Sequence, residues 1–217
     1  MFKNFDHIKI ASYLVYFLVP AIVTGPFLSD LSLSIIALYF LIIFIVYKPY
    51  EIVPKEFTYL FFLSFFYIVV RSIFSEFSYN SLTYDGVVFY FRYYFFCLGI
   101  VYLSVNNPNL IKNIVFISLI TTLVVISDGV LQLITGKNIL GWDILYRVSG
   151  LFKDELVIGI FLSKIILLIF TFYDLTYPNR YKKLRYFCLL LGLIFLIYTR
   201  ERAALVLFLS YFLFYLA

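Results

Sequence analysis

Charged side chains are scarce in this sequence: Asp, Glu, Lys and Arg make up only 13% of its 217 residues, whereas 64% are hydrophobic and 23% are aromatic. The mean hydropathy of +1.02 is far above that of an ordinary soluble domain. This balance excludes a water-soluble fold and predicts an all-α, polytopic transmembrane helix bundle. The few polar residues are therefore the informative ones, because burial in lipid makes them costly.

Histidine and cysteine are also rare. The single histidine, His7, precedes the first apolar run, and Cys97 and Cys188 both fall inside apolar runs, where we interpret them as small buried hydrophobes. A histidine-based metal site and an outward-facing Ser-His triad are thereby excluded. The sequence also contains no Gly-rich phosphate loop and no paired-cysteine spacing. We therefore expect no metal, no cofactor and no nucleic-acid partner, and any transferase activity must draw its donor from the membrane.

Apolar runs divide the chain at regular intervals. A transmembrane helix needs about 20 largely apolar residues, with a minimum of roughly 17. We predict eight spans, near 8–28, 31–47, 57–74, 87–105, 110–134, 154–173 and 184–198 and from Ala203 onward. The last run reaches Ala217 without a flanking charge. We therefore expect residues 1–217 to form a single integral membrane domain that is the N-terminal part of a longer protein.

The distribution of basic residues predicts the orientation, because short cytoplasmic loops are enriched in Lys and Arg. Most basic residues outside the spans lie on the side of the N-terminus: Lys3, Lys9, Lys48, Lys55, Lys112, Arg180, Lys182, Lys183 and Arg185. Fewer lie on the opposite side: Lys137, Arg147, Lys153, Arg200 and Arg202. The N-terminus is thus predicted to be cytoplasmic, and loop 135–153 and the T-R-E-R turn at 199–202 to face outward. Basic residues on that disfavoured side suggest anion binding.

A few polar residues lie inside the predicted spans. Arg92 and Asp128 fall at similar depths in antiparallel spans, so they could form an ion pair or contact a substrate. Gln132 follows Asp128 by four residues and shares its helix face, which we expect to look into the bundle. Lys164 lies about 15 Å below Asp154 and is predicted to line a polar cavity or to neutralise a buried carboxylate.

If the chain is a transferase whose donor comes from the membrane, an isoprenoid-linked sugar is a plausible donor. Its pyrophosphate leaving group needs cationic stabilisation, and the planar guanidinium of arginine binds phosphate with two hydrogen bonds. Three outward-facing arginines are candidates: Arg147, Arg200 and Arg202. Three carboxylates in the same two loops could act as general base on an acceptor hydroxyl: Asp154, Glu155 and Glu201. Alternatively, the T-R-E-R turn is a plain interfacial hairpin, and D-E at 154–155 is a pair of acidic residues that favours a helix N-terminus.

At this point the residues resemble a known family. The segment RVSGLFKDELVIGIFLSK at 147–164 is similar to the R-x-S-G-x-F-x-D-E-x-x-x-G segment of bacterial O-antigen polymerases in the O-antigen ligase-like membrane superfamily. Three further segments agree in the expected order: FRYYFFCLGIVYL at 91–103, SDGVLQLITGKNILGWD at 127–143 and YTRERAALVLF at 198–208. The resemblance covers roughly residues 85–217.

The resemblance implies an enzyme of the bacterial inner membrane that joins undecaprenyl-pyrophosphate-linked oligosaccharide repeats at the periplasmic face, as in O-antigen synthesis. It implies partners of three kinds: the lipid-linked oligosaccharide, membrane lipid and a chain-length regulator. The catalytic residues would be Arg147, Asp154, Glu155 and Arg200. The candidates for substrate binding are Arg92, Asp128, Gln132, Lys164, Glu201 and Arg202, of which Arg202 fits the charge pattern without a matching motif position.

Three other functions stay open. The first is an O-antigen ligase; ligase relatives carry a histidine in a large periplasmic loop, and this sequence has none beyond His7. The second is a transporter or flippase of lipid-linked sugars, which would place polar residues near the midplane and in both leaflets. The third is a non-catalytic membrane scaffold.

Overall fold

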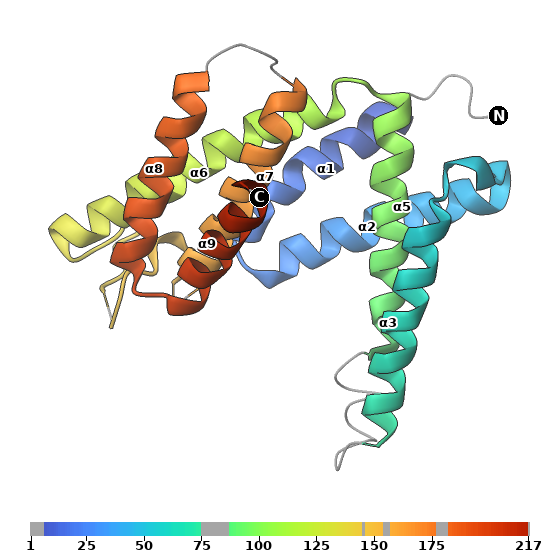
Figure 1. Ribbon diagram of the computed structural model, residues 1–217, viewed down its shortest axis with the longest axis horizontal. Helices are drawn as coiled ribbons and strands as arrows, with labels where there is room; N and C mark the ends of the chain where they lie inside the picture. The colour runs from blue at the N-terminus through green and yellow to red at the C-terminus, as the bar shows by residue number, and fades with distance from the viewer. Residues whose placement is uncertain (1–6, 75–86, 145, 154–156, 177–181, 217) are drawn as a thin grey trace. The chain divides into compact units, whose positions relative to one another are not determined.

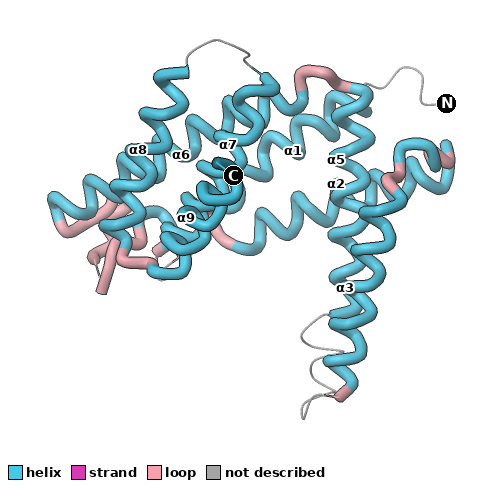
Figure 2. The backbone as a smooth tube through the Cα atoms, viewed as in Figure 1, coloured by secondary structure: helices cyan, strands magenta, loops and turns pink. Residues whose placement is uncertain are grey.

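The computed structural model describes residues 7–74, 87–144, 146–153, 157–176 and 182–216, and these residues are almost entirely helical (Figures 1 and 2). The α-helices are α1 (His7–Val23), α2 (Pro26–Tyr47), α3 (Lys55–Ile73), α5 (Phe91–Asn106), α6 (Leu110–Thr135), α7 (Ile158–Thr176), α8 (Lys182–Thr199) and α9 (Arg202–Leu216). Short 3-10 helices cover Tyr50–Ile52, Val87–Tyr90 and Gly150–Phe152. The described part of the chain contains no strand beyond a single bridge between Lys137 and Asp143. The predicted all-α class is therefore confirmed.

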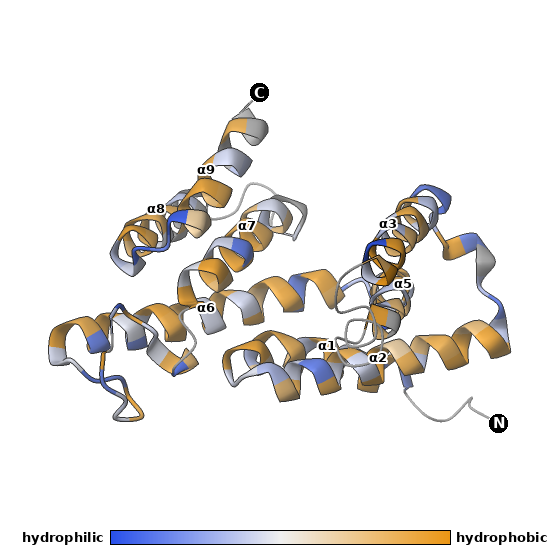
Figure 3. Cartoon of the chain, turned by 90° about the horizontal axis from the view of Figure 1, so that it is seen from below, coloured by the Kyte–Doolittle hydropathy of each residue, from blue (hydrophilic) through white to orange (hydrophobic). Residues whose placement is uncertain are grey.

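Three of these helices are long and apolar enough to cross a membrane: α2, α3 and α6. Colouring the ribbon by hydropathy shows that hydrophobic residues predominate along the helices (Figure 3). Large side chains such as Phe27, Tyr59 and Phe66 are mostly exposed, which suits contact with lipid. These features are those of a membrane protein.

Glycine and proline set the helix ends more sharply than the apolar runs do. The first run was predicted to extend to residue 28, but α1 ends at Val23 and α2 begins at Pro26. The reason is that Gly25 adopts a φ of +119°, which favours glycine, and proline is well suited to the first turn of a helix. In α6, the amide of Gly136, at a φ of +79°, donates to the carbonyl of Gln132 and closes the helix.

The chain forms two compact units, of which the first comprises residues 1–18 and 29–108. Aromatic rings join α3 to α5 within this unit: the ring of Tyr94 is stacked on Phe57 at 6.0 Å and lies 5.0 Å from Phe61. Gly99 of α5 lets that helix approach α2, because a Cβ atom there would lie 3.2 Å from the Cβ of Phe40. Aromatic pairs and small residues of this kind let helices pack closely in lipid, where the hydrophobic effect does not drive helices together.

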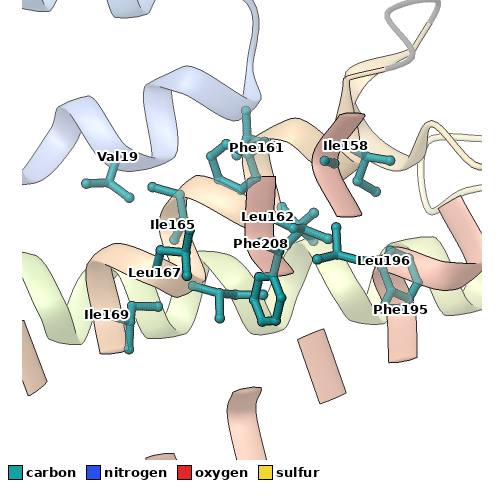
Figure 4. Close-up of a cluster of buried hydrophobic side chains, with 14 of the residues drawn as sticks. Val19, Ile158, Phe161, Leu162, Ile165, Leu167, Ile169, Phe195, Leu196 and Phe208 are labelled. Atoms are coloured by element: carbon teal, nitrogen blue, oxygen red, sulfur yellow. The ribbon is translucent and has the colours of Figure 1, made fainter. Parts of the chain in front are cut away.

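The second unit comprises residues 19–28 and 109–217 and is built around α7. Helix α7 packs against α6, α8 and α9. Its buried face includes Ile158 and Leu162, which belong to one cluster of buried side chains with Leu196 of α8 and Phe208 of α9 (Figure 4). Both the loop and the turn that carry the candidate arginines belong to this unit.

Candidate functional site

The loop that follows α6 is held in place by side chains of α6. Gln132 is fully buried, and its Oε1 atom accepts hydrogen bonds from the backbone amides of Ser149 and Gly150, at 3.1 and 2.8 Å. Its Nε2 atom also donates to the carbonyl of Trp142 at 3.4 Å. One side chain thus holds two separate stretches of the loop, at Trp142 and at Ser149–Gly150, against the helix.

Asp128 supports the same loop one helical turn earlier. Its carboxylate is 5% exposed, and Oδ1 accepts a hydrogen bond from the amide of Ile139 at 2.8 Å. A Cβ atom at Gly150 would lie 3.1 Å from Oδ2 of Asp128 and 3.1 Å from Cδ1 of Ile158. Gly150 also has a φ of +54°, so glycine suits both the backbone conformation and the space. A short 3-10 helix, Gly150–Phe152, begins at this glycine.

Asn138 is a structural residue that the sequence prediction missed. Its side chain is buried within the loop; Oδ1 accepts from the amides of Leu140 and Trp142, and Nδ2 donates to the carbonyl of Gly150. The amide of Gly141 closes the turn on the carbonyl of Asn138 at 2.9 Å. Asn at the first position of a turn and Gly at the fourth is a known turn signal. That signal could have identified the fold of this loop.

The loop displays two cationic residues, Arg147 and Lys153, at its surface. Arg147, predicted to be catalytic, is half-buried and precedes the buried Val148. The ammonium group of Lys153 lies 5.9 Å from the ring centre of Trp142, within the range of a cation–π contact. Between these two cationic residues in the sequence, Phe152 is buried against Phe161 of α7. The loop is therefore a packed element with a cationic surface.

The T-R-E-R turn between α8 and α9 alternates buried and exposed side chains. Thr199 and Glu201 are 0% and 5% exposed, whereas Arg200 and Arg202 are exposed. Arg200 has a φ of +58°, which is uncommon for a residue other than glycine. This backbone conformation lets the two arginines face outward from either side of a buried carboxylate.

Glu201 binds the beginning of α7. Its Oε1 atom accepts from the amide of Gly159 at 2.8 Å, and Oε2 accepts from the amide of Ile160 at 2.9 Å. The first amides of a helix lack partners within the helix, and a carboxylate there is favoured by the helix dipole. From the sequence, Asp154 and Glu155 were predicted to lie at this helix start, but both are outside the described residues. Among the described residues, Glu201 supplies the carboxylate that binds the first amides of α7.

The loop and the turn both contact the first residues of α7. Gly150 lies against Ile158, and Glu201 binds Gly159. A cavity of about 350 Å³ opens at the turn, within the size range of about 300–1,000 Å³ that is common for ligand pockets. It is lined by Leu196, Ile197, Arg200, Glu201, Arg202 and Leu205. The arrangement offers two guanidinium groups, beside apolar walls, to an anionic ligand.

Two other predicted site residues have different surroundings. Arg92 belongs to the first unit, where it forms an ion pair with Asp30 at 3.0 Å and donates to the hydroxyl of Ser34 at 3.3 Å. The predicted pairing of Arg92 with Asp128 would join residues of the two units and stays a prediction, whereas within the first unit the partner of Arg92 is Asp30. Lys164 is exposed on α7, so the structure does not bury it beside a carboxylate.

The chain matches no protein-family model, no curated protein and no solved structure.

Proposed function

We propose that the chain is a glycan polymerase that joins undecaprenyl-pyrophosphate-linked oligosaccharide repeats at the periplasmic face of the bacterial inner membrane. The observation that carries this proposal is the cavity at the turn, where Arg200 and Arg202 flank the buried Glu201. Guanidinium groups suit a leaving pyrophosphate, since they bind its oxygens with paired hydrogen bonds and stabilise the charge that develops in the transition state.

The proposed reaction is a single group transfer. A hydroxyl of the acceptor sugar attacks the anomeric carbon of the lipid-linked donor, and the bond from that carbon to the pyrophosphate oxygen breaks. The products are the new glycosidic bond and undecaprenyl pyrophosphate, whose charge Arg200 and Arg202 stabilise. Asp154 or Glu155 takes the proton of the attacking hydroxyl as general base. Arg147 adds a further cation from the loop.

The polar residues of α6 have a supporting role in this scheme. Asp128 and Gln132 bind the backbone of the loop, and we propose that they hold Arg147 in position without contacting the sugar. The scheme also places the N-terminus in the cytoplasm and all eight helices across the membrane, so that the loop and the turn both face outward. A chain-length regulator is the expected protein partner.

The test is the length profile of surface polysaccharide in a polymerase-null bacterium that makes the cognate repeat. The gene containing this sequence should restore a ladder, and changing both Arg200 and Arg202 to alanine should reduce long chains about 100-fold, as for other losses of transition-state charge stabilisation. Lys137→Ala is the matched control, because Lys137 is an exposed loop cation that pairs with Asp143 at 3.5 Å. That variant should keep the ladder.

Other outcomes would favour the alternative functions. Repeats that accumulate on the cytoplasmic side in the arginine variant would indicate a flippase. A ligase would restore no ladder in this host, but in a ligase-null strain that keeps its own polymerase it would restore attachment of the polymer to its final acceptor. A ladder that is unchanged in the double variant, at equal membrane abundance, would contradict the proposed role of the two arginines.

A further inference from the structure

We propose that Glu201 is a positioning residue that holds Arg200 and Arg202 in the geometry needed to bind a pyrophosphate group. This inference rests on the proposed function and adds a role for a residue that would otherwise be counted as a substrate contact or a general base. The two oxygens of Glu201 are occupied by the amides of Gly159 and Ile160, and the side chain is only 5% exposed. It is therefore poorly placed to take a proton from a sugar hydroxyl.

The packing around Glu201 ties the turn to α7. A Cβ atom at Gly159 would lie 2.8 Å from Cδ of Glu201 and 2.8 Å from Oγ1 of Thr199, so the turn and the helix approach each other closely. Thr199 is buried and donates to the carbonyl of Leu196 at 2.8 Å. The residue on either side of Glu201 is an exposed arginine. Fixing this one carboxylate thus fixes the backbone from which both guanidinium groups extend.

Two possible roles of Glu201, a negative charge near the arginines and a residue that positions them, predict opposite changes in anion affinity when its charge is removed. If the carboxylate acted only through its negative charge, its loss would strengthen the binding of an anion at the neighbouring arginines. If it positions the arginines, Glu201→Gln should weaken binding, because the carboxamide offers one acceptor oxygen to the two helix amides and turns an NH₂ group toward the other. The sign of the change therefore distinguishes the two roles.

The experiment is isothermal titration calorimetry of the full-length protein in detergent with farnesyl pyrophosphate, and with inorganic pyrophosphate in a second arm. We expect Glu201→Gln to bind farnesyl pyrophosphate about tenfold more weakly than the wild type, the scale of one charge-assisted hydrogen bond. Asp143→Asn is the matched control, because Asp143 is a carboxylate of the same outward side whose side chain is 70% exposed. Its affinity should stay within about twofold of the wild type, as expected for a screened surface charge.

The outcomes separate this inference from the proposed function. Unchanged or tighter binding by folded Glu201→Gln, with wild-type binding intact, would overturn the positioning role alone. No saturable binding by the wild type would overturn the proposed pyrophosphate site, and with it the inference. Tight binding of inorganic pyrophosphate would show that the headgroup suffices, as a site built on the two arginines predicts. If only the farnesyl compound binds, and an Arg200→Ala variant binds it with the affinity of the wild type, then the assignment of the arginines to the pyrophosphate is wrong.

A second measurement covers the case in which Glu201→Gln does not fold. Farnesyl pyrophosphate bound to the wild type should slow hydrogen exchange at the amides of Gly159 and Ile160, because a stabilised turn keeps Glu201 on these donors. Exchange that is unchanged at both amides under saturating ligand would overturn the coupling between the arginines and α7.

Discussion

Gly159→Ala is expected to destabilise the second unit by about 3 kcal/mol, as the combined result of overpacking and weakened hydrogen bonds to a charged group. The added methyl carbon would lie 2.8 Å from both Cδ of Glu201 and Oγ1 of Thr199, and 3.0 Å from Cβ of Glu201. The carboxylate cannot move aside without losing its two helix amides. Thermal unfolding in detergent, followed by the emission of Trp142, measures the change.

Gly192→Ala is the matched control for this prediction. Gly192 is a buried helical glycine in the same unit, but its added methyl group would meet the end of the flexible side chain of Ile166. That side chain can change rotamer, so the cost should be clearly smaller. A Gly159→Ala protein that unfolds at the same temperature as the wild type would contradict the close contact between the turn and α7.

Gln132→Leu is expected to release the loop from α6. Leucine fills a similar space, but it leaves the buried amides of Ser149 and Gly150 without their acceptor. An unsatisfied buried donor costs about 1–3 kcal/mol, so we expect a loss of about 2–4 kcal/mol in stability. Trp142 is the only tryptophan in the chain and its carbonyl accepts a bond from Gln132, so its emission should shift to the red and its quenching by acrylamide should increase.

Leu133→Ala provides the comparison for this result. Leu133 follows Gln132 in α6 but is exposed, so its truncation should leave the emission of Trp142 unchanged. If the emission and quenching of Gln132→Leu equal those of the wild type, then the loop does not depend on Gln132 and the proposed support of Arg147 is wrong.

The helices could be predicted from the sequence because their signal is local. The run predicted at 110–134 is α6, Leu110–Thr135, and the run at 184–198 is α8, Lys182–Thr199. The inward face carrying Asp128 and Gln132 followed from their spacing of four residues, and both are buried. Where the prediction was wrong, at the end of the first helix, the Gly25-Pro26 pair was the overlooked local signal.

The partners of the polar residues could not be predicted in the same way. Glu201 and Gly159 are far apart in the sequence, and only the packing of α8 and α9 on α7 brings them together. Two similar depths in the predicted spans suggested a pair between Arg92 and Asp128, and that pair between residues of the two units stays a prediction. The partner of Arg92 within the first unit is Asp30, an exposed residue near the start of α2 that lies between two of the predicted spans.

The most direct test of the central claim uses the purified protein in liposomes with undecaprenyl-pyrophosphate-linked repeats as the sole sugar substrate. The account predicts that longer lipid-linked chains form without any nucleotide sugar, and that one undecaprenyl pyrophosphate is released for each bond made. Repeats that stay single while the protein moves them across the bilayer, or that lengthen only when a nucleotide sugar is added, would contradict it.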